Sequence, residues 1–222
     1  AASDVYKRQY EDAMLWLVMG KNMWHRKIAL LMRKFGSPGR VWEASYEQLV
    51  QSGILKEEDA GELCESRENF DPAAEWCKLE QKGIRFLTDR SEEFPKKLLD
   101  IPDRPYALFI KGCIHSDGTE KRVAVIGARV CSAYGRYAAG KFAGELAEYG
   151  IATVSGMARG VDSAAHQGTV DAGGRTYAIL GCGVDICYPP ENKYLYDRII
   201  EQGAVLSEYP PGTRPNLSLI HI

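Results

Sequence analysis

From residue 122 onward, short apolar runs alternate with longer amphipathic segments, and this alternation limits the possible folds more than any other feature of the sequence. Four runs have the length and composition of strands, at residues 123–126, 151–154, 176–180 and 204–206. Three segments between them have helical length and spacing, at residues 134–149, 160–172 and 191–202. Because parallel strands need crossover connections, such alternation is typical of a parallel sheet covered by helices. The right-handed crossover rule then predicts a doubly wound, Rossmann-like α/β sheet.

Two details of this pattern predict which side chains are buried. The run from Val123 to Ile126 is apolar at every position, which is typical of a strand that is covered on both faces. The helix that follows has one apolar stripe, which we expect to face the core. The stripe consists of Ala138, Phe142, Leu146 and Ala147.

The chain before this sheet divides into two further parts. Apolar residues at helical spacing over residues 10–66 predict a small all-α domain, with two of its short helices at 42–50 and 56–64. The stretch from Gly36 to Gly39 is a stop signal within it. Residues 67–120 combine a helix at 72–83 with short strands at 84–87 and 106–111. We therefore expect three parts: a helical domain at 10–66, a connecting α/β segment at 67–120 that packs on the sheet domain, and the sheet domain at 121–215.

The two ends of the chain differ from the rest. Residues 1–9 and 217–222 resemble translated sequencing-adaptor ends, and we expect both to be non-native. A proline-rich turn at 210–212 leads into the last segment, where no further helix or strand is predicted. On this interpretation the sheet domain is incomplete.

Composition narrows the class of protein. The formal net charge is −2, from 28 basic and 30 acidic residues, which excludes the strongly basic whole-protein charge of many duplex binders but allows a local basic pocket. The six cysteines form no C-x-x-C pair and no zinc-spaced cluster with histidine, so we expect free thiols and no metal. The apolar stretches are too short to span a bilayer, and the N-terminus lacks the order of a secretory signal. These features predict a cytoplasmic protein that does not associate with membranes.

Glycine-bearing turns follow three of the predicted strands, at residues 127–129, 155–160 and 181–183. Ligands of open parallel sheets bind beyond the carboxyl ends of the strands, and glycine lets the backbone approach them closely. Arg129 and Arg159 add forked cationic donors that suit phosphate oxygens. The sequence therefore predicts a phosphate site at this edge of the sheet, formed with Gly127, Ser155 and Gly156.

Each of these features has a structural interpretation as well. The glycines also suit tight turns between strand and helix, and the arginines also suit ion pairs with Asp162, Asp185 or Glu208. Asn192 follows a proline-led helix start and is a further candidate for the ligand crevice. His166 lies within a predicted helix, where a packed histidine is the usual interpretation.

The motifs of common enzymes are missing. The first strand is not followed by G-x-G-x-x-G, and no acidic residue ends the second strand, which disfavours a dinucleotide-dependent oxidoreductase. There is also no Walker lysine loop, no H-E-x-x-H and no G-x-S-x-G nucleophile elbow. We therefore expect a protein that is not an enzyme and that needs no cofactor.

The turns and their flanking segments together resemble the DprA/Smf family of bacterial DNA-processing proteins. The resemblance runs in order through nearly all of residues 122–215. Its segments read VAVIGAR at 123–129, SGMARGVDSAAH at 155–166, GGRTYAILGCGVD at 173–185, YPPEN at 188–192 and LSEYPPGT at 206–213. The helical part, with Phe35 to Pro38, resembles more loosely the family's sterile-alpha-motif (SAM) or helix-hairpin-helix-like domain.

The resemblance implies a function that the motifs alone do not give. It implies a cytoplasmic homodimer that binds single-stranded DNA with little sequence preference. It also implies loading of the RecA recombinase onto that DNA during natural transformation, the recombination route of competent cells. Arg129 matches the Gly-x-Arg turn at the family's DNA pocket, and Gly127, Ser155, Gly156 and Arg159 match positions along its rim. The family's basic loop after Pro-Gly-Thr is replaced here from Asn216 onward, which implies that part of the pocket, the dimer face and any winged helix are absent.

Two other functions remain open on the sequence. A nucleotide N-glycosidase of the phosphoribohydrolase type has a related architecture, but its Pro-Gly-Gly-x-Gly-Thr loop with a nearby glutamate is not found. A pure interaction module, in which the glycines only shape turns, is the third alternative. Binding of oligothymidylate or of AMP would discriminate among the three.

Overall fold

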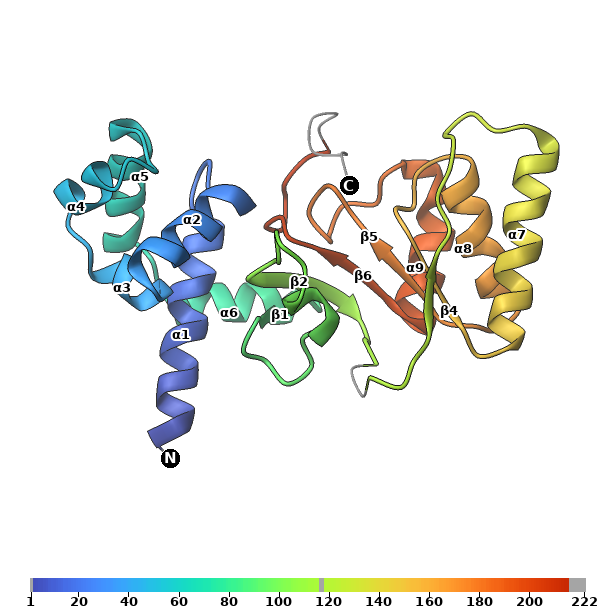
Figure 1. Ribbon diagram of the computed structural model, residues 1–222, viewed down its shortest axis with the longest axis horizontal. Helices are drawn as coiled ribbons and strands as arrows, with labels where there is room; N and C mark the ends of the chain where they lie inside the picture. The colour runs from blue at the N-terminus through green and yellow to red at the C-terminus, as the bar shows by residue number, and fades with distance from the viewer. Residues whose placement is uncertain (1, 116–117, 216–222) are drawn as a thin grey trace. The chain divides into compact units, whose positions relative to one another are not determined.

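The computed structural model describes residues 2–115 and 118–215, and the chain divides into two compact units, residues 1–108 and 109–222 (Figure 1). Among the described residues, no helix has both the length and the apolar character needed to cross a membrane. The three-part division expected from the sequence stays a prediction.

Unit 1 is mainly helical. Its elements are α1 (Ala2–Met19), α2 (His25–Phe35), α3 (Pro38–Glu43), α4 (Tyr46–Gln51), α5 (Glu57–Glu68), α6 (Pro72–Gln81), β1 (Arg85–Thr88) and the 3₁₀ helix η1 (Lys96–Leu99). Trp16 is fully buried, contacts Trp42 edge to face with ring centroids 4.9 Å apart, and donates a hydrogen bond to Ser66 Oγ at 2.9 Å. All four tryptophans of the chain, at positions 16, 24, 42 and 76, belong to this unit.

Two expectations for unit 1 need correction. The helix expected at 42–50 is two helices, because the Ser45 side chain accepts a hydrogen bond from the Gln48 N–H and begins α4 with a capping box. The stretch 36–39, expected to be a stop signal, ends one helix and begins the next. Gly36 ends α2 in the left-handed conformation, and Pro38 is the first residue of α3. Residues 2–9, which lie in the segment expected to be non-native, form the first half of α1.

The second unit contains the parallel sheet, which confirms the predicted α/β fold. The strands are β2 (Ala107–Gly112), which runs across the unit boundary, β3 (Arg122–Ala124), β4 (Ala152–Ser155), β5 (Thr176–Ile179) and β6 (Ala204–Ser207). The order in the six-stranded sheet is β1-β2-β6-β5-β4-β3. Strands β3 to β6 are parallel with their neighbours, whereas β2 runs antiparallel to β6. The helices are α7 (Ala133–Glu148), α8 (Val161–Asp171), the 3₁₀ helix η2 (Pro190–Asn192) and α9 (Lys193–Gln202).

The three long helices of unit 2 lie side by side, with α8 between α7 and α9 (Figure 1). Because the chain steps from β3 to β6 in one direction, right-handed crossovers place these helices on one face of the sheet. Helix α8 is tied to the strands beneath it by buried polar pairs. Thr169 Oγ1 donates to Thr153 Oγ1 at 2.8 Å, and His166 Nδ1 lies 2.6 Å from Thr176 Oγ1.

Glycines bring α7 and α8 into backbone contact. A Cβ atom placed on Gly168 would lie 2.0 Å from the carbonyl oxygen of Gly140, and one placed on Gly144 would lie 3.3 Å from the carbonyl oxygen of Gly168. No side chain fits between the two helices at this crossing. The contact therefore fixes their separation at a smaller value than ordinary side chains allow.

The expected burial at β3 and on the following helix was wrong. Strand β3 ends the sheet order and is exposed, and Ile126 just after it is 75% exposed. In the predicted stripe, Phe142 is 60% exposed, whereas the buried residues of α7 are Ala139 and Ala143. The reason is that α7 approaches α8 through glycine and alanine, which turns the larger apolar residues away from the contact.

Candidate functional site

The carboxyl ends of the four parallel strands lie at one edge of the sheet, as predicted. The loops that leave these ends, at 125–132, 156–160, 180–189 and 208–215, form what we call the carboxyl crest. A pocket of about 280 Å³ lies within it and is lined by residues of all four loops. The lining residues are Arg129, Val130, Gly156, Ala158, Arg159, Leu180, Gly181, Cys182, Tyr188, Pro189 and Pro215. The pocket thus brings together three of the predicted site residues, two arginines and a glycine, and none of its lining residues within the described ranges 2–115 and 118–215 is acidic.

Arg129 is exposed and uncommitted. Within residues 2–115 and 118–215, no hydrogen bond or ion pair engages its side chain, and none engages the N–H groups of residues 127–129. Gly127 is required for this arrangement, because a Cβ atom there would lie 2.8 Å from Cγ2 of Val161 at the start of α8. The turn therefore presents a guanidinium and a short row of amide donors to solvent, which is a suitable arrangement for phosphate oxygens.

Arg159 also lines the pocket, but it already has an anionic partner. Its Nε donates to Glu191 Oε1 at 2.5 Å, and both side chains are more than half exposed. The hydrogen bond between them raises the pKa of the Arg159 guanidinium and lowers the pKa of the Glu191 carboxyl. An exposed pair of this kind contributes little to stability, because solvent screens the two charges from each other. A phosphate group that approaches the pocket can therefore compete with Glu191 for Arg159.

The loop that carries Arg159 is held by side chains from two helices. The Gly156 N–H donates to Asp162 Oδ2 at 3.2 Å, and Ser163 Oγ donates to the carbonyl oxygen of Ala158 at 2.5 Å. The Asn192 amide donates to the Met157 carbonyl oxygen at 3.1 Å and to Ser163 Oγ at 2.7 Å. The structure thus places Asn192 behind the loop, where its amide hydrogens are engaged, and not in the pocket.

Ser155 lies beneath the crest and is buried. Its Oγ donates to the carbonyl oxygen of Val125 at 2.6 Å, which ties the end of β4 to the turn after β3. Ser207 makes the equivalent contact at the end of β6, where its Oγ donates to the carbonyl oxygen of Leu180 at 3.1 Å. These two serines hold the crest loops together, and neither lines the pocket.

Sequence reasoning missed two features of the site. Glu191 read only as an acidic residue in the first turn of a helix, because its partner Arg159 is 32 positions away. Tyr188 read only as part of a helix start, yet its ring lines the pocket and is partly exposed. Two of the three carboxylates proposed as arginine partners bind backbone groups: Asp162 accepts from the Gly156 N–H, and Asp185 accepts from the Gly212 N–H at 2.7 Å.

His166 is a packed histidine, in agreement with its usual interpretation. The ring is fully buried between α8 and the sheet, and it does not line the crest pocket. Burial lowers the pKa of His166 from 6.5 to about 4. The neutral form is therefore the one that the folded protein holds.

Comparisons with known proteins identify the family of the chain. The family model described as DNA recombination-mediator protein A matches residues 85–219. Protein Smf from Synechocystis is 36% identical over 152 residues, which cover 67% of this chain and 38% of that protein. The structure of DNA processing protein A from Streptococcus pneumoniae is similar with a TM-score of 0.72 at 27% identity, and the match covers 94% of this chain and 71% of that one.

A second solved structure is also similar to this chain. It is DNA processing protein A from Helicobacter pylori, described by its single-stranded DNA binding mode, with a TM-score of 0.53 at 28% identity over 62% of each chain. The chain spans about two-fifths of the length of the curated relatives that it matches, between 38% and 43% for the Synechocystis, Mycobacterium tuberculosis and S. pneumoniae proteins.

Proposed function

This chain belongs to the DNA recombination-mediator protein A family, and we propose that it binds single-stranded DNA at the carboxyl crest. The observation that carries the proposal is the uncommitted guanidinium of Arg129 beside the free N–H groups of residues 127–129. These donors bind phosphates and do not read bases, which accounts for a low sequence preference. Tyr188 supplies an aromatic ring in the same pocket on which a base can stack.

The proposal also includes a role for the bound DNA in the cell. We propose that the protein acts in the cytoplasm, without a catalytic step, and passes the bound strand to the RecA recombinase during natural transformation. The membership of the family supports this role, as does the H. pylori relative that is described as binding single-stranded DNA. We also propose that the intact protein works as a homodimer.

Replacement of Arg129 by alanine tests the proposal directly. The variant should bind oligothymidylate roughly tenfold to a hundredfold more weakly, since a hydrogen bond to a charged group contributes about 1.5–3 kcal/mol. The slope of log K against log salt should become shallower by about 0.7, the value for one phosphate contact on a single strand. Fluorescence anisotropy across a salt titration measures both quantities.

Arg33, an exposed arginine at the end of α2 in unit 1, provides the matched control. Arg33→Ala should leave affinity and salt slope unchanged. Equal binding by wild type and Arg129→Ala at every salt concentration contradicts the proposal. Release of adenine from AMP by the wild-type chain would instead support the N-glycosidase alternative.

Replacement of Glu191 by glutamine should strengthen the binding of oligothymidylate, whereas Arg129→Ala should weaken it. The change removes the carboxylate that competes for Arg159 and leaves the guanidinium available to phosphate. We expect tighter binding by roughly twofold to fivefold, within the range of an exposed ion pair, and a steeper salt slope. The same titration checks it, and in an Arg159→Ala background the gain should disappear. A persistent gain in that background would show that Glu191 acts by general repulsion and not through Arg159.

A further inference from the structure

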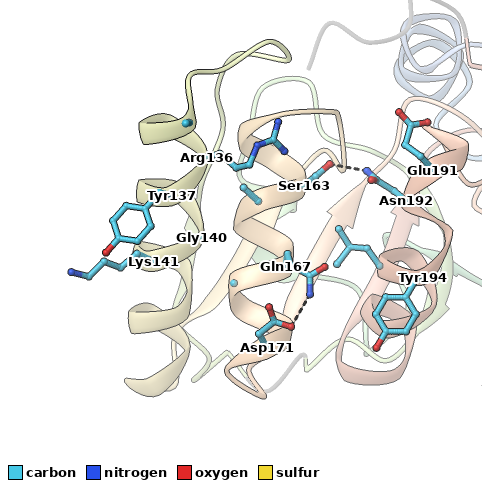
Figure 2. A pocket seen from close by; sticks show the side chains of 14 residues that line it. Arg136, Tyr137, Gly140, Lys141, Ser163, Gln167, Asp171, Glu191, Asn192 and Tyr194 are labelled. Carbon is cyan, nitrogen blue, oxygen red and sulfur yellow. Dashed lines mark hydrogen bonds between the residues drawn. The ribbon is translucent and has the colours of Figure 1, made fainter.

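A groove of about 730 Å³ lies on the outer face of the three helices of unit 2 (Figure 2). Helix α8 forms its floor, where the small residues Ala164 and Gly168 leave the surface low. The N-terminal half of α7 forms one wall, and η2 with the start of α9 forms the other. The groove is more than twice as large as the crest pocket.

The groove continues from the crest. Glu191 and Asn192 line its crest end, together with Ser163 from the first turn of α8 (Figure 2). Glu191 is the residue that holds Arg159, and Arg159 lines the crest pocket. A single exposed ion pair thus stands between the two hollows, and the carboxyl side of that pair belongs to the groove.

The crest end of the groove carries a positive side chain. Within the described part of the chain, the exposed Arg136 makes no ion pair and no side-chain hydrogen bond, and it points from α7 toward α8 at the crest end (Figure 2). Lys141 pairs with Glu145 at 3.7 Å, and Asp171, which accepts a hydrogen bond from Gln167 at 2.7 Å, lies at the opposite end of the groove (Figure 2). An anionic occupant of the crest end therefore meets the Arg136 guanidinium, and the nearest carboxylate there, Glu191, is held by Arg159.

Two of the residues that line the groove are aromatic, Tyr137 on α7 and Tyr194 on α9. The Tyr137 ring points away from α8, whereas Tyr194 lies on the α9 side of the groove and is 67% exposed (Figure 2). Exposed aromatic rings beside a cationic group are the elements with which proteins hold single strands without reading sequence, because every base has a face that can stack.

The crest pocket is too small to hold more than a short part of a DNA strand. At about 280 Å³ it lies below the range of about 300–1,000 Å³ for pockets of drug-sized ligands, so it can enclose little more than one nucleotide. Known single-strand sites extend over about 4–16 nucleotides. A strand bound at the crest must leave the pocket, and the groove adjoins the pocket at the Arg159–Glu191 pair, of which Arg159 lines the pocket and Glu191 lines the groove.

We propose that the groove between α7 and α9 is a second subsite for single-stranded DNA, in which Arg136 contacts a phosphate and Tyr194 stacks a base. This inference rests on the proposed function of the crest. The strand passes over the Arg159–Glu191 pair, so the two subsites bind different nucleotides of the same strand. Short strands occupy the crest alone, and longer strands occupy both subsites.

Oligonucleotide length separates the two subsites. The 222-residue chain is titrated with oligothymidylates of about six and about twenty nucleotides, lengths on either side of the usual site size. The Arg136→Ala/Tyr194→Ala double variant should bind the long strand about tenfold more weakly and the short strand as the wild type does. Arg129→Ala should weaken binding of both lengths. Tyr149→Ala, which removes an exposed tyrosine at the other end of the α7 region, is the matched control and should change neither.

The outcomes are distinct. If the double variant binds the long strand as tightly as the wild type while Arg129→Ala still weakens both, the groove is not a subsite and the crest proposal survives. If Arg129→Ala has no effect on either length, the proposed function itself fails. If the double variant changes only self-association, measured by sedimentation, the groove belongs to a protein contact and the inference is overturned.

A photocrosslink supplies a measurement that does not depend on affinity. A photoreactive thymine analogue is placed at one position after another along the long oligothymidylate. Crosslinks to Tyr194 should come from positions several nucleotides away from those that crosslink to Tyr188 in the crest pocket. Crosslinks to both residues from the same position would contradict the separation of the subsites.

Discussion

Replacement of Gly168 by alanine is expected to destabilise unit 2 by about 3 kcal/mol or more, the upper range for overpacking a tight contact. The added Cβ atom would lie 2.0 Å from the carbonyl oxygen of Gly140, 2.7 Å from its carbonyl carbon and 2.8 Å from its Cα atom. All three are backbone atoms, so no side-chain rotation can relieve the overlap and the two helices must separate. Denaturant unfolding followed by far-ultraviolet circular dichroism measures the loss.

Gly135 in the first turn of α7 provides the matched control. A Cβ atom there would meet its nearest neighbour, Ser132 Oγ, at 3.4 Å, which is an ordinary contact. Gly135→Ala should therefore leave stability unchanged or raise it by up to about 1 kcal/mol through helix propensity. Superimposable unfolding curves for Gly168→Ala and Gly135→Ala would show that α7 and α8 do not pack as closely as described.

The second large effect concerns pH. The pKa of His166 is about 4 in the folded chain, below the 6.5 of an unperturbed histidine. Above pH 6.5 the ring is neutral in both states, and His166 adds no pH dependence. As the pH falls from 6.5 to about 4, the unfolded chain takes up a proton that the folded chain does not, so stability decreases. The total loss from this group is on the order of 3 kcal/mol.

Carboxylates also titrate near the lower end of this pH range. The contribution of His166 is therefore measured as the difference in stability between the wild type and a variant. His166→Gln removes the titrating ring, and its stability should fall less steeply between pH 6.5 and 4 than that of the wild type. Parallel curves for the wild type and His166→Gln would mean that His166 is protonated in the folded state.

The architecture of unit 2 could be predicted because crossover connections leave few choices. Short apolar runs separated by helical segments imply parallel neighbours, and parallel neighbours place their carboxyl ends at one edge. The positions of Arg129 and Arg159 on the crest follow from that alone. The burial of α7 could not be predicted in the same way. Its apolar stripe pointed to Phe142 as a core residue, whereas glycine and alanine make the actual contact with α8.

The roles of individual site residues depend on contacts that periodicity does not encode. Asn192 and Ser155 were predicted to face the ligand, but both are used to fix loops, through Met157 and Val125 respectively. The pairing of Arg159 with Glu191 joins a turn after β4 to a helix start after β5. Such contacts between distant segments need the folded arrangement, and the sequence offered only a set of carboxylates as candidates.

The position of the tryptophans has a practical consequence for spectroscopy. All four indole rings belong to unit 1, whereas eight of the twelve tyrosines, from Tyr134 to Tyr209, belong to unit 2. Selective excitation of indole emission therefore reports directly on the helical unit, with Trp76 at its edge against Phe86 of β1. Phenol emission or backbone dichroism must accompany a melting curve recorded in that channel, because unit 2 contains no indole ring.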